Sequence, residues 1–370
     1  MPIHYQEGAL HHFLTSTPIR ASAPCRIDMG GTLDIRSFYL PLGHLSPCTV
    51  NIALNLRTSV SLQPYETGRI KVSSKGFDSA AFPLDTAPFN HPMGLIFAVA
   101  SYFRAEGVHV HIDSTSPPRS ALGGSSVAAV ALVAAFDAAC CAIEKRPQMN
   151  PSQIARLAHA IEESVAGVPC GTQDQLAAAF GGVNAWYWRY GPDGPFFEQR
   201  ALAPEMAGMM EKRLLVAYCG IPHESKDVNS RWVRQFLAGD TRDNWASIVT
   251  LVHRFEQALR TMNMDEAVAA MNREMALRKE MTPDVLDDIG NKLVTAALET
   301  GCGARISGAG AGGCIWALGE PERMRRLRTE WHRIAGARQD ARLLDAGIDM
   351  RGVMIETGGC TAIPENDEVY

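Results

Sequence analysis

The feature that most constrains the fold is a glycine- and serine-rich segment that runs directly into a long apolar stretch. The segment PPRSALGGSSVAAVALVAAF begins at Pro117, and its alanine-rich part predicts a helix over 125–143. The longest unbroken apolar run, Val127–Phe136, is much shorter than the roughly 20 residues that span a bilayer. The sequence therefore predicts no membrane span.

The start of this helix is also a candidate ligand site. Gly123 and Gly124 let the backbone approach a ligand closely, and Ser125 and Ser126 stand where unpaired N–H groups and the positive end of the helix dipole favour an anion. The spacing fits neither a Walker A loop, since no GKS or GKT follows, nor the GxGxxG fingerprint. A phosphate site and a glycine turn with a serine helix cap are both consistent with these residues.

Length and composition limit the class of protein. At about 150 residues per domain, 370 residues predict two domains. Lysine and arginine number 35 and aspartate and glutamate 40, and this net charge of −5 argues against nucleic-acid or anionic-membrane binding, which needs clustered basic residues. Nine cysteines without a CxxC pair, and an N terminus without a signal pattern, predict a cytoplasmic enzyme of small molecules.

The pattern of strands and helices predicts a mixed α/β chain in two halves. The first half begins with alternating strand and turn segments and then becomes helical, with a second helix over 151–166. The second half opens with a strand at RLLVAYCG and continues with helices, and an arginine-rich amphipathic helix is predicted over 321–342. We expect domains at 1–205 and 206–370.

Two further segments carry residues suited to chemistry. ESVAGVPCGTQDQLAAAFGG puts Asp174 in a turn before a helix-like run, twelve residues after Glu162, so that two carboxylates flank one irregular loop. RISGAGAGGCIWAL places a glycine loop between two buried strands, where it can lie against a polyanion or another loop. Taken singly, these segments are equally consistent with an aspartate helix cap, a surface glutamate and a glycine hairpin.

Three motifs occur in the order typical of one family: APCRIDMGGTLDI from Ala23, PPRSALGGSSVAA from Pro117 and ARISGAGAGGCIWAL from Ala304. The chain thereby resembles the GHMP kinases. GVPCGTQDQ, from Gly167, is similar to the galactokinase loop, and the second motif is closer to the heptose kinase pattern. The resemblance implies an α+β fold, with an N-terminal α/β domain that has a mixed sheet and a C-terminal ferredoxin-like α/β domain. ATP and the acceptor would meet between them.

The resemblance also implies roles for individual residues. Ser126 and Glu162 would hold Mg²⁺. Asp174 would accept or orient the proton of the acceptor hydroxyl, and the positive charge of Arg26 would keep that carboxylate ionised and contact the γ-phosphate. The ATP phosphates would be wrapped by Leu122, Gly123, Gly124, Ser125 and Ser126.

The acceptor side departs from the galactokinase pattern. Galactokinases carry GEHTDY after the arginine, whereas this chain has GGTLDI, which lacks Glu-His and is one residue shorter to Asp34. Thr32 and Asp34 fit either ligands for sugar hydroxyls or a polar turn. His223, in GIPHESKDVN, fits either a substrate contact or part of a capped helix start. The acceptor residues predicted from the resemblance are Thr32, Asp34, Gly171, Asp174 and His223.

The sequence thus predicts an ATP- and Mg²⁺-dependent kinase that phosphorylates a monosaccharide, either galactose-like or heptose-phosphate-like. Two alternatives remain: a mevalonate-pathway kinase or decarboxylase of the same superfamily, and a noncatalytic sensor that binds ATP and sugar. The expected partners are ATP and the sugar, without nucleic acid or membrane, in a monomer or homodimer. Cys170 is interpreted as a packing residue, because no histidine lies near it in sequence.

Overall fold

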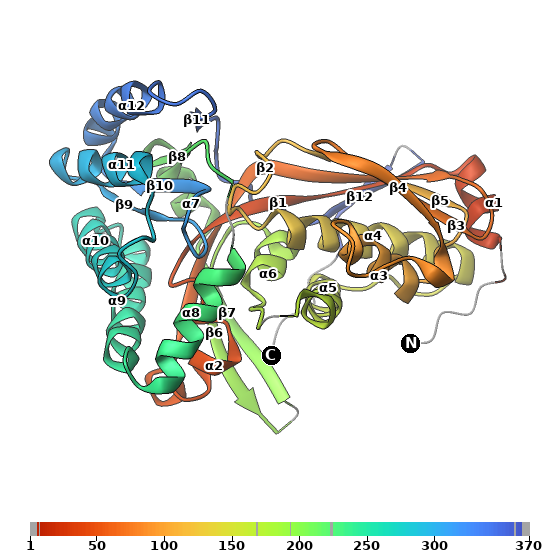
Figure 1. The fold of residues 1–370 in the computed structure, drawn as a ribbon, viewed down its shortest axis with the longest axis horizontal. Coiled ribbons are helices and arrows are strands. Elements are labelled where there is room, and N and C mark those ends of the chain that lie inside the picture. The colour runs from red at the N-terminus through yellow and green to blue at the C-terminus, as the bar shows by residue number, and fades with distance from the viewer. Residues whose placement is uncertain are drawn as a thin grey trace.

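Two β-sheets, each covered by helices, make up the computed structural model, which describes Gln6 and residues 8–167, 169–192, 194–222, 225–358 and 360–364. The larger sheet and its helices lie to the right in Figure 1, and the smaller sheet and its helices lie to the left. This agrees with the predicted α+β class, which combines a mixed sheet with a second α/β unit.

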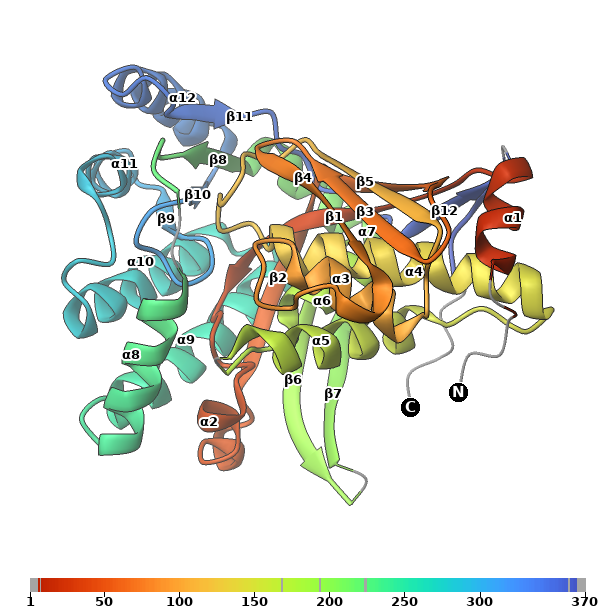
Figure 2. The ribbon, with the colours of Figure 1, turned by 45° about the vertical axis from the view of Figure 1, so that its right-hand side comes forward.

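The larger sheet has nine strands in the described chain, and the β3–β5 pair is its one parallel pair there. Its long central strands carry alternating apolar residues, which place one face of the sheet against the helices. The β6–β7 hairpin extends away from the rest of the chain (Figure 2). The strands are β1 (Ile19–Met29), β2 (Cys48–Pro64), β3 (Arg69–Ser74), β4 (Phe77–Pro83), β5 (Val108–Ser114), β6 (Val183–Gly191), β7 (Gly194–Ala201), β12 (Met354–Thr357) and β13 (Cys360–Ala362).

Helix α4 (Gly124–Glu144) is the central helix against this sheet and confirms the helix predicted over 125–143. Among the described helices it alone is long and apolar enough to cross a membrane, but 89% of its most apolar window is buried within the fold. Such burial is typical of a core helix in a soluble protein. The other helices before the second sheet are α1 (Ala9–Ser16), α2 (Arg36–Tyr39), α3 (Gly94–Tyr102), α5 (Pro151–Ala166), α6 (Gln173–Phe180) and α7 (Pro204–Met210).

The smaller sheet has four antiparallel strands in the order β11 (Arg342–Leu344), β8 (Leu214–Tyr218), β10 (Cys314–Leu318) and β9 (Gly303–Ile306). With helices between β8 and β9 and between β10 and β11, this is the βαββαβ order of a ferredoxin-like unit, as predicted. The helices are α8 (Ser225–Ala238), α9 (Arg242–Arg260), α10 (Met264–Met281), α11 (Asp288–Glu299) and α12 (Pro321–Ala335).

The arginine-rich helix is shorter than predicted. It was expected over 321–342 but ends at Ala335, because the chain turns after Gly336 and Arg342 begins the edge strand β11, which pairs with β8. Local periodicity continues past the turn, whereas strand pairing with a distant segment ends the helix.

The last described strands return to the larger sheet. β12 pairs with β1, and Arg57 of β2 donates to the carbonyl oxygens of Ser22 at 2.7 Å and Gly352 at 2.8 Å and to Asp349 Oδ2 at 2.6 Å. These bonds tie the C-terminal segment to the strand that carries Arg26. The division at 1–205 and 206–370 stays a prediction, and by strand pairing β12 and β13 belong with the first sheet.

Candidate active site

A cavity of about 760 Å³ lies where the two sheet units meet. Its lining comes from both units, with Gly308 from the loop between β9 and β10 and Arg342 from β11. The four residues expected to act together, although far apart in sequence, all line it: Arg26, Ser126, Glu162 and Asp174. The structure thus places them around one space, and their roles remain predictions.

Arg26, on β1, is the residue that links the separate segments of the site. Its Nε donates to Asp174 Oδ1 at 2.7 Å, and one terminal nitrogen donates to the carbonyl oxygen of Ala121 at 2.7 Å and to Ser307 Oγ at 3.1 Å. Burial alone would lower the pKa of Arg26, but the charges of Asp174 and Asp28 outweigh it and raise that pKa above its usual range. Arg26 is therefore a permanent positive charge beside Asp174.

The N terminus of α4 opens on the cavity, and the two serines there do not cap it. Ser125 Oγ donates to Glu162 Oε1 at 2.9 Å and Ser126 Oγ donates to Glu162 Oε2 at 2.7 Å. No side chain of the described residues bonds to the first N–H groups of this helix as a cap. The alternative of a simple serine cap is therefore wrong, and the helix N terminus keeps its affinity for an anion.

Glu162, on α5, accepts three hydrogen bonds, the third from Gln175 Nε2 at 2.6 Å. Burial raises the pKa of Glu162 above its usual range, although the two serine hydroxyls oppose this effect. Among the described residues, no group of three or more His, Cys, Asp or Glu could hold a metal ion alone. A magnesium ion needs fewer protein ligands, since it commonly uses one or two carboxylates plus substrate phosphates and water.

Asp174 lies in the first turn of α6 and not in the turn that was predicted before that helix. The helix begins earlier because the N–H of Gln173 is bonded by the carboxylate of Asp34, at 3.0 Å. The negative Asp174 is favourable near the positive end of this short helix. Gln173 and Gln175, on either side of it, contact Asp34 and Glu162 and were missed by the sequence analysis, although the segment GTQDQ contains both.

Asp34 is a buried carboxylate that lines the cavity, as do Thr32 and Gly171, which were also predicted to contact the acceptor. Burial raises the pKa of Asp34 to about 7, against the opposing hydrogen bond from Gln173. A Cβ at Gly171 would lie 1.7 Å from Asp34 Oδ2, so only glycine fits there. Thr32 has a φ of +82°, a strained conformation for a β-branched residue that is typical of functional sites.

The third glycine loop lies against another loop, which was one of the two interpretations. A Cβ at Gly313 would lie 2.8 Å from the carbonyl oxygen of Ser120, and Ser307 Oγ donates to the carbonyl oxygen of Ala121 at 3.0 Å. The loop therefore holds the segment before Gly123 in position. Gly308 also lines the cavity.

Leu122 and His223 are not among the residues observed to line the cavity, whereas Cys170, interpreted from the sequence as a packing residue, does line it. Leu122 is not among the lining residues, because its side chain is fully buried in the core and its carbonyl oxygen accepts the N–H of Arg26. His223 lies outside the described residues. Cys170 lines the cavity, and burial raises the pKa of its thiol to about 12, so it stays protonated near neutral pH.

Family models match both halves of the chain. The GHMP kinases N terminal domain matches residues 90–182, which include α4, α5 and the Asp174 segment, and the GHMP kinases C terminal matches residues 255–337, which include the third glycine loop. The two matched regions thus contain Ser126, Glu162 and Asp174 of the cavity lining and Gly308 of the third glycine loop, whereas Arg26, Thr32, Asp34 and Arg342 lie outside them.

Curated relatives are kinases of different small molecules. Mevalonate kinase of Thermococcus sibiricus is 26% identical over 308 residues, which cover 75% of this chain and 84% of that protein. D-glycero-alpha-D-manno-heptose 7-phosphate kinase of Campylobacter jejuni is 26% identical over 242 residues, 65% of this chain and 69% of that protein.

Solved structures share the fold. A putative sugar kinase from Campylobacter jejuni superposes with a TM-score of 0.67 at 21% identity, covering 92% of this chain and 98% of that one. Lactococcus lactis galactokinase complexed with galactose superposes with a TM-score of 0.69 at 15% identity, covering 94% and 95%.

The buried carboxyl of Asp34 predicts a pH-dependent difference between the protein and its Asp34→Asn variant. Because the pKa is about 7 when folded and about 3.9 when unfolded, folding favours the protonated acid, and stability is lost as pH rises from 4 through 7. The full loss is about 4 kcal/mol. Relative to the unaltered protein, Asp34→Asn should therefore gain stability between pH 5 and pH 8.5 in urea unfolding. Exposed Asp113→Asn is the matched control. If the free energies of unfolding of the unaltered protein and Asp34→Asn changed in parallel with pH, the raised pKa of Asp34 would be contradicted.

Proposed function

The chain belongs to the GHMP kinase superfamily, and from this membership we propose that it transfers the γ-phosphate of ATP to a hydroxyl group of a monosaccharide. Its superfamily and its kinase-named relatives make it a phosphotransferase with an alcohol group as acceptor, with ATP as the co-substrate of the family. The observation that carries the sugar kinase proposal is the Arg26–Asp174 ion pair at 2.7 Å, in one cavity with the buried carboxylate of Asp34.

We propose that the phosphates of ATP bind at the N terminus of α4. The uncapped N–H groups of Gly124, Ser125 and Ser126, at the positive end of a 21-residue helix, supply donors and a favourable field for an anion. Phe77, Ile96 and Ile112 give the cavity an apolar part that suits an adenine ring. The loop that contains Gly308 supports the phosphate-binding segment from the other unit.

Arg26 and Asp174 would act on the transfer itself. Asp174 accepts or orients the proton of the acceptor hydroxyl, and the fixed positive charge of Arg26 keeps that carboxylate ionised and stabilises charge on the transferred group. Because phosphoryl transfer passes through a loose transition state, positioning and charge contribute more than proton abstraction. The hydrogen bond between Arg26 and Asp174 would keep the two side chains in a fixed relative position.

Ser126 and Glu162 fit a magnesium ion bound together with ATP. Their oxygens are the hard ligands that Mg²⁺ prefers, and they lie 2.7 Å apart beside the proposed phosphate site. Burial, the largest cause of the raised pKa of Glu162, disfavours its ionised form, and a bound cation would favour that form. When bound, the ion would neutralise charge on the phosphate oxygens.

Asp34 supports a sugar as the acceptor. A buried carboxylate accepts hydrogen bonds from two hydroxyl groups and discriminates against analogues that lack them, whereas it repels an anionic group. A neutral polyhydroxylated end of the acceptor therefore fits beside Asp34, Thr32 and Gly171. A mevalonate-type acceptor is the second candidate, because mevalonate kinases of Thermococcus and Pyrococcus species are among the curated relatives.

We further propose a cytoplasmic monomer or homodimer whose partners are ATP and the sugar, without nucleic acid or membrane. The net charge of −5 and the absence of CxxC pairs from the sequence support this setting. The proposed units are residues 1–205 and 206–370, except that β12 and β13 of the second range belong to the first sheet.

A substrate panel tests the acceptor class. ADP release with Mg²⁺ and ATP is measured across aldoses, heptose phosphates and mevalonate, and we expect release with an aldose or a heptose phosphate. Faster release with mevalonate would favour the second candidate. Release with none of them, despite tight sugar binding, would contradict the kinase proposal and favour a sensor.

Asp174→Asn should abolish turnover while ATP still binds. Loss of the charge that receives or orients the proton is expected to lower kcat by about 10²- to 10⁴-fold, without removing any group of the proposed phosphate site. Steady-state kinetics and calorimetric titration with ATP measure the two effects, with exposed Asp113→Asn as the matched control. Near-normal turnover would remove Asp174 from its role.

Ser126→Ala and Glu162→Gln should each raise the Mg²⁺ concentration needed for half-maximal turnover, because each removes one of the proposed oxygen ligands or its charge. Titrating turnover with Mg²⁺ at saturating ATP measures this requirement. Ser125→Ala, which removes the other serine hydroxyl on Glu162, is the matched control. Titration curves that coincide with that of the unaltered protein would show that neither residue serves the metal.

A further inference from the structure

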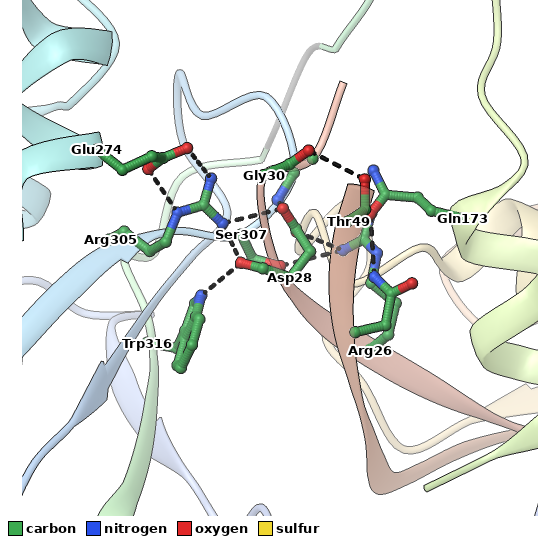
Figure 3. Close-up of polar contacts among 12 residues, drawn as sticks. Arg26, Asp28, Gly30, Thr49, Gln173, Glu274, Arg305, Ser307 and Trp316 are labelled. Atoms are coloured by element: carbon green, nitrogen blue, oxygen red, sulfur yellow. Dashed lines mark hydrogen bonds and ion pairs between the residues drawn. The ribbon is translucent and has the colours of Figure 1, made fainter. Parts of the chain in front are cut away.

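Six buried or half-buried side chains of alternating charge form a chain from the proposed catalytic carboxylate into the second unit. Each member contacts the next by an ion pair, and the chain crosses from β1 of the first sheet to β9 and α10 of the second unit. Figure 3 shows its centre, where Arg305 lies between Glu274 and Asp28. In order, the members are Asp174, Arg26, Asp28, Arg305, Glu274 and Arg278.

Asp28 occupies the point where the two units meet. Its Oδ1 accepts the N–H of Gly308 at 2.7 Å and lies 3.5 Å from a terminal nitrogen of Arg26, while its Oδ2 accepts from Arg305 at 2.9 Å. The backbone carbonyl oxygen of Asp28 accepts from Arg305 and, at 3.2 Å, from Trp316 Nε1. One residue therefore contacts Arg26, the third glycine loop and the second sheet.

The far end of the chain anchors Arg305. Glu274 accepts from Arg305 at 3.0 and 3.3 Å and from Arg278 at 2.5 Å, and all three side chains are fully buried. Arg278 also donates to the carbonyl oxygen of Gly31 at 2.7 Å, just past the end of β1. Its guanidinium lies 4.8 Å from the ring centroid of Trp232. Glu274 thus compensates the buried charge of Arg305, and its described ion pairs are with Arg305 and Arg278 and not with Arg26.

Charge balance makes Asp28 hard to replace. Burial alone would raise the pKa of Asp28, but Arg305 and Arg26 outweigh it and hold that pKa below its usual range, so the carboxylate is ionised. Removing one partner from such a buried pair leaves an uncompensated charge, whereas removing both charges together is often tolerated. Comparing a variant that lacks one charge of the pair with a variant that lacks both therefore separates the effect of Asp28 on folding from its effect on the site.

We propose that Asp28 is a positioning residue for phosphoryl transfer: it holds the guanidinium of Arg26 and the backbone of Gly308 at fixed places relative to Asp174. The inference rests on the proposed roles of Arg26 and Asp174. Asp28 lies one strand repeat from Arg26, on the same face of β1, and its other oxygen is held by Arg305. The second unit thereby sets the position of a catalytic side chain in the first.

The test compares two variants that each remove one buried negative charge next to Arg305. Asp28→Asn loses the contact with Arg26, whereas Glu274→Gln is the matched control that leaves it intact. ADP release by each variant is measured with the fastest acceptor of the panel. It is also measured at high enzyme concentration without added acceptor, so that water is the only acceptor. The melting temperature of each variant is recorded as well. Asp28→Asn should lower kcat about 100-fold, as for a misplacement of about 1 Å, with KM for ATP nearly unchanged. Glu274→Gln should lower the melting temperature comparably but kcat only a few-fold.

A double variant keeps the test valid if Asp28→Asn does not fold. Asp28→Asn with Arg305→Gln removes one charge of each sign, so it should regain thermal stability while kcat stays low. If kcat instead recovers with the melting temperature, or if Asp28→Asn turns over normally, the inference is overturned. Normal turnover of Asp174→Asn would overturn the proposed function itself, whereas an inactive Asp174→Asn beside a normal Asp28→Asn would overturn only the role of Asp28.

Discussion

The buried guanidinium of Arg26 is the interaction on which the site depends. A buried charge costs several kcal/mol unless hydrogen bonds and opposite charge compensate it. Here the compensation comes from Asp174 of α6, from the carbonyl oxygen of Ala121 and from Ser307 of the second unit. Each of these groups belongs to a different segment of the chain, so satisfying one arginine brings the three segments together. The geometry of the site is thus a consequence of electrostatic compensation in the core.

Much of this arrangement could be predicted from the sequence, because several of its signals are local. The apolar stretch after Gly123 predicts α4 almost to its ends, and the residues shared with a kinase family led to Arg26, Ser126, Glu162 and Asp174, which line one cavity. The start of α6 could not be predicted. The N–H of its first residue, Gln173, is bonded to the carboxylate of Asp34, 139 residues away, and no local pattern reveals such a contact. Asp174 therefore lies in a helix where a turn was expected.

Contacts between the units were the other part that sequence reasoning missed. Asp28 stands two residues after Arg26, and in a strand such residues share a face, so this spacing was the available signal. Its partner Arg305 comes from a strand 277 residues away, which local periodicity cannot pair with it. The same limit applies to β12, which could not be assigned to the first sheet until its pairing with β1 was seen. In each case the missing information is a tertiary contact.

The acidic groups of the cavity connect binding to protonation. Burial is the largest cause of the raised pKa values of both Asp34 and Glu162, and neither carboxylate has a basic side chain among its described hydrogen-bond partners. Their ionisation is therefore incompletely compensated while only protein groups surround them. Hydroxyl donors bound at Asp34, or positive charge bound at Glu162, would favour the ionised carboxylates. Binding of such a ligand would therefore be coupled to the release of protons from these two groups. In the proposed binding mode a polyphosphate alone would add negative charge beside Glu162, so a nucleotide that arrives with a divalent cation would bind there more favourably than a bare one.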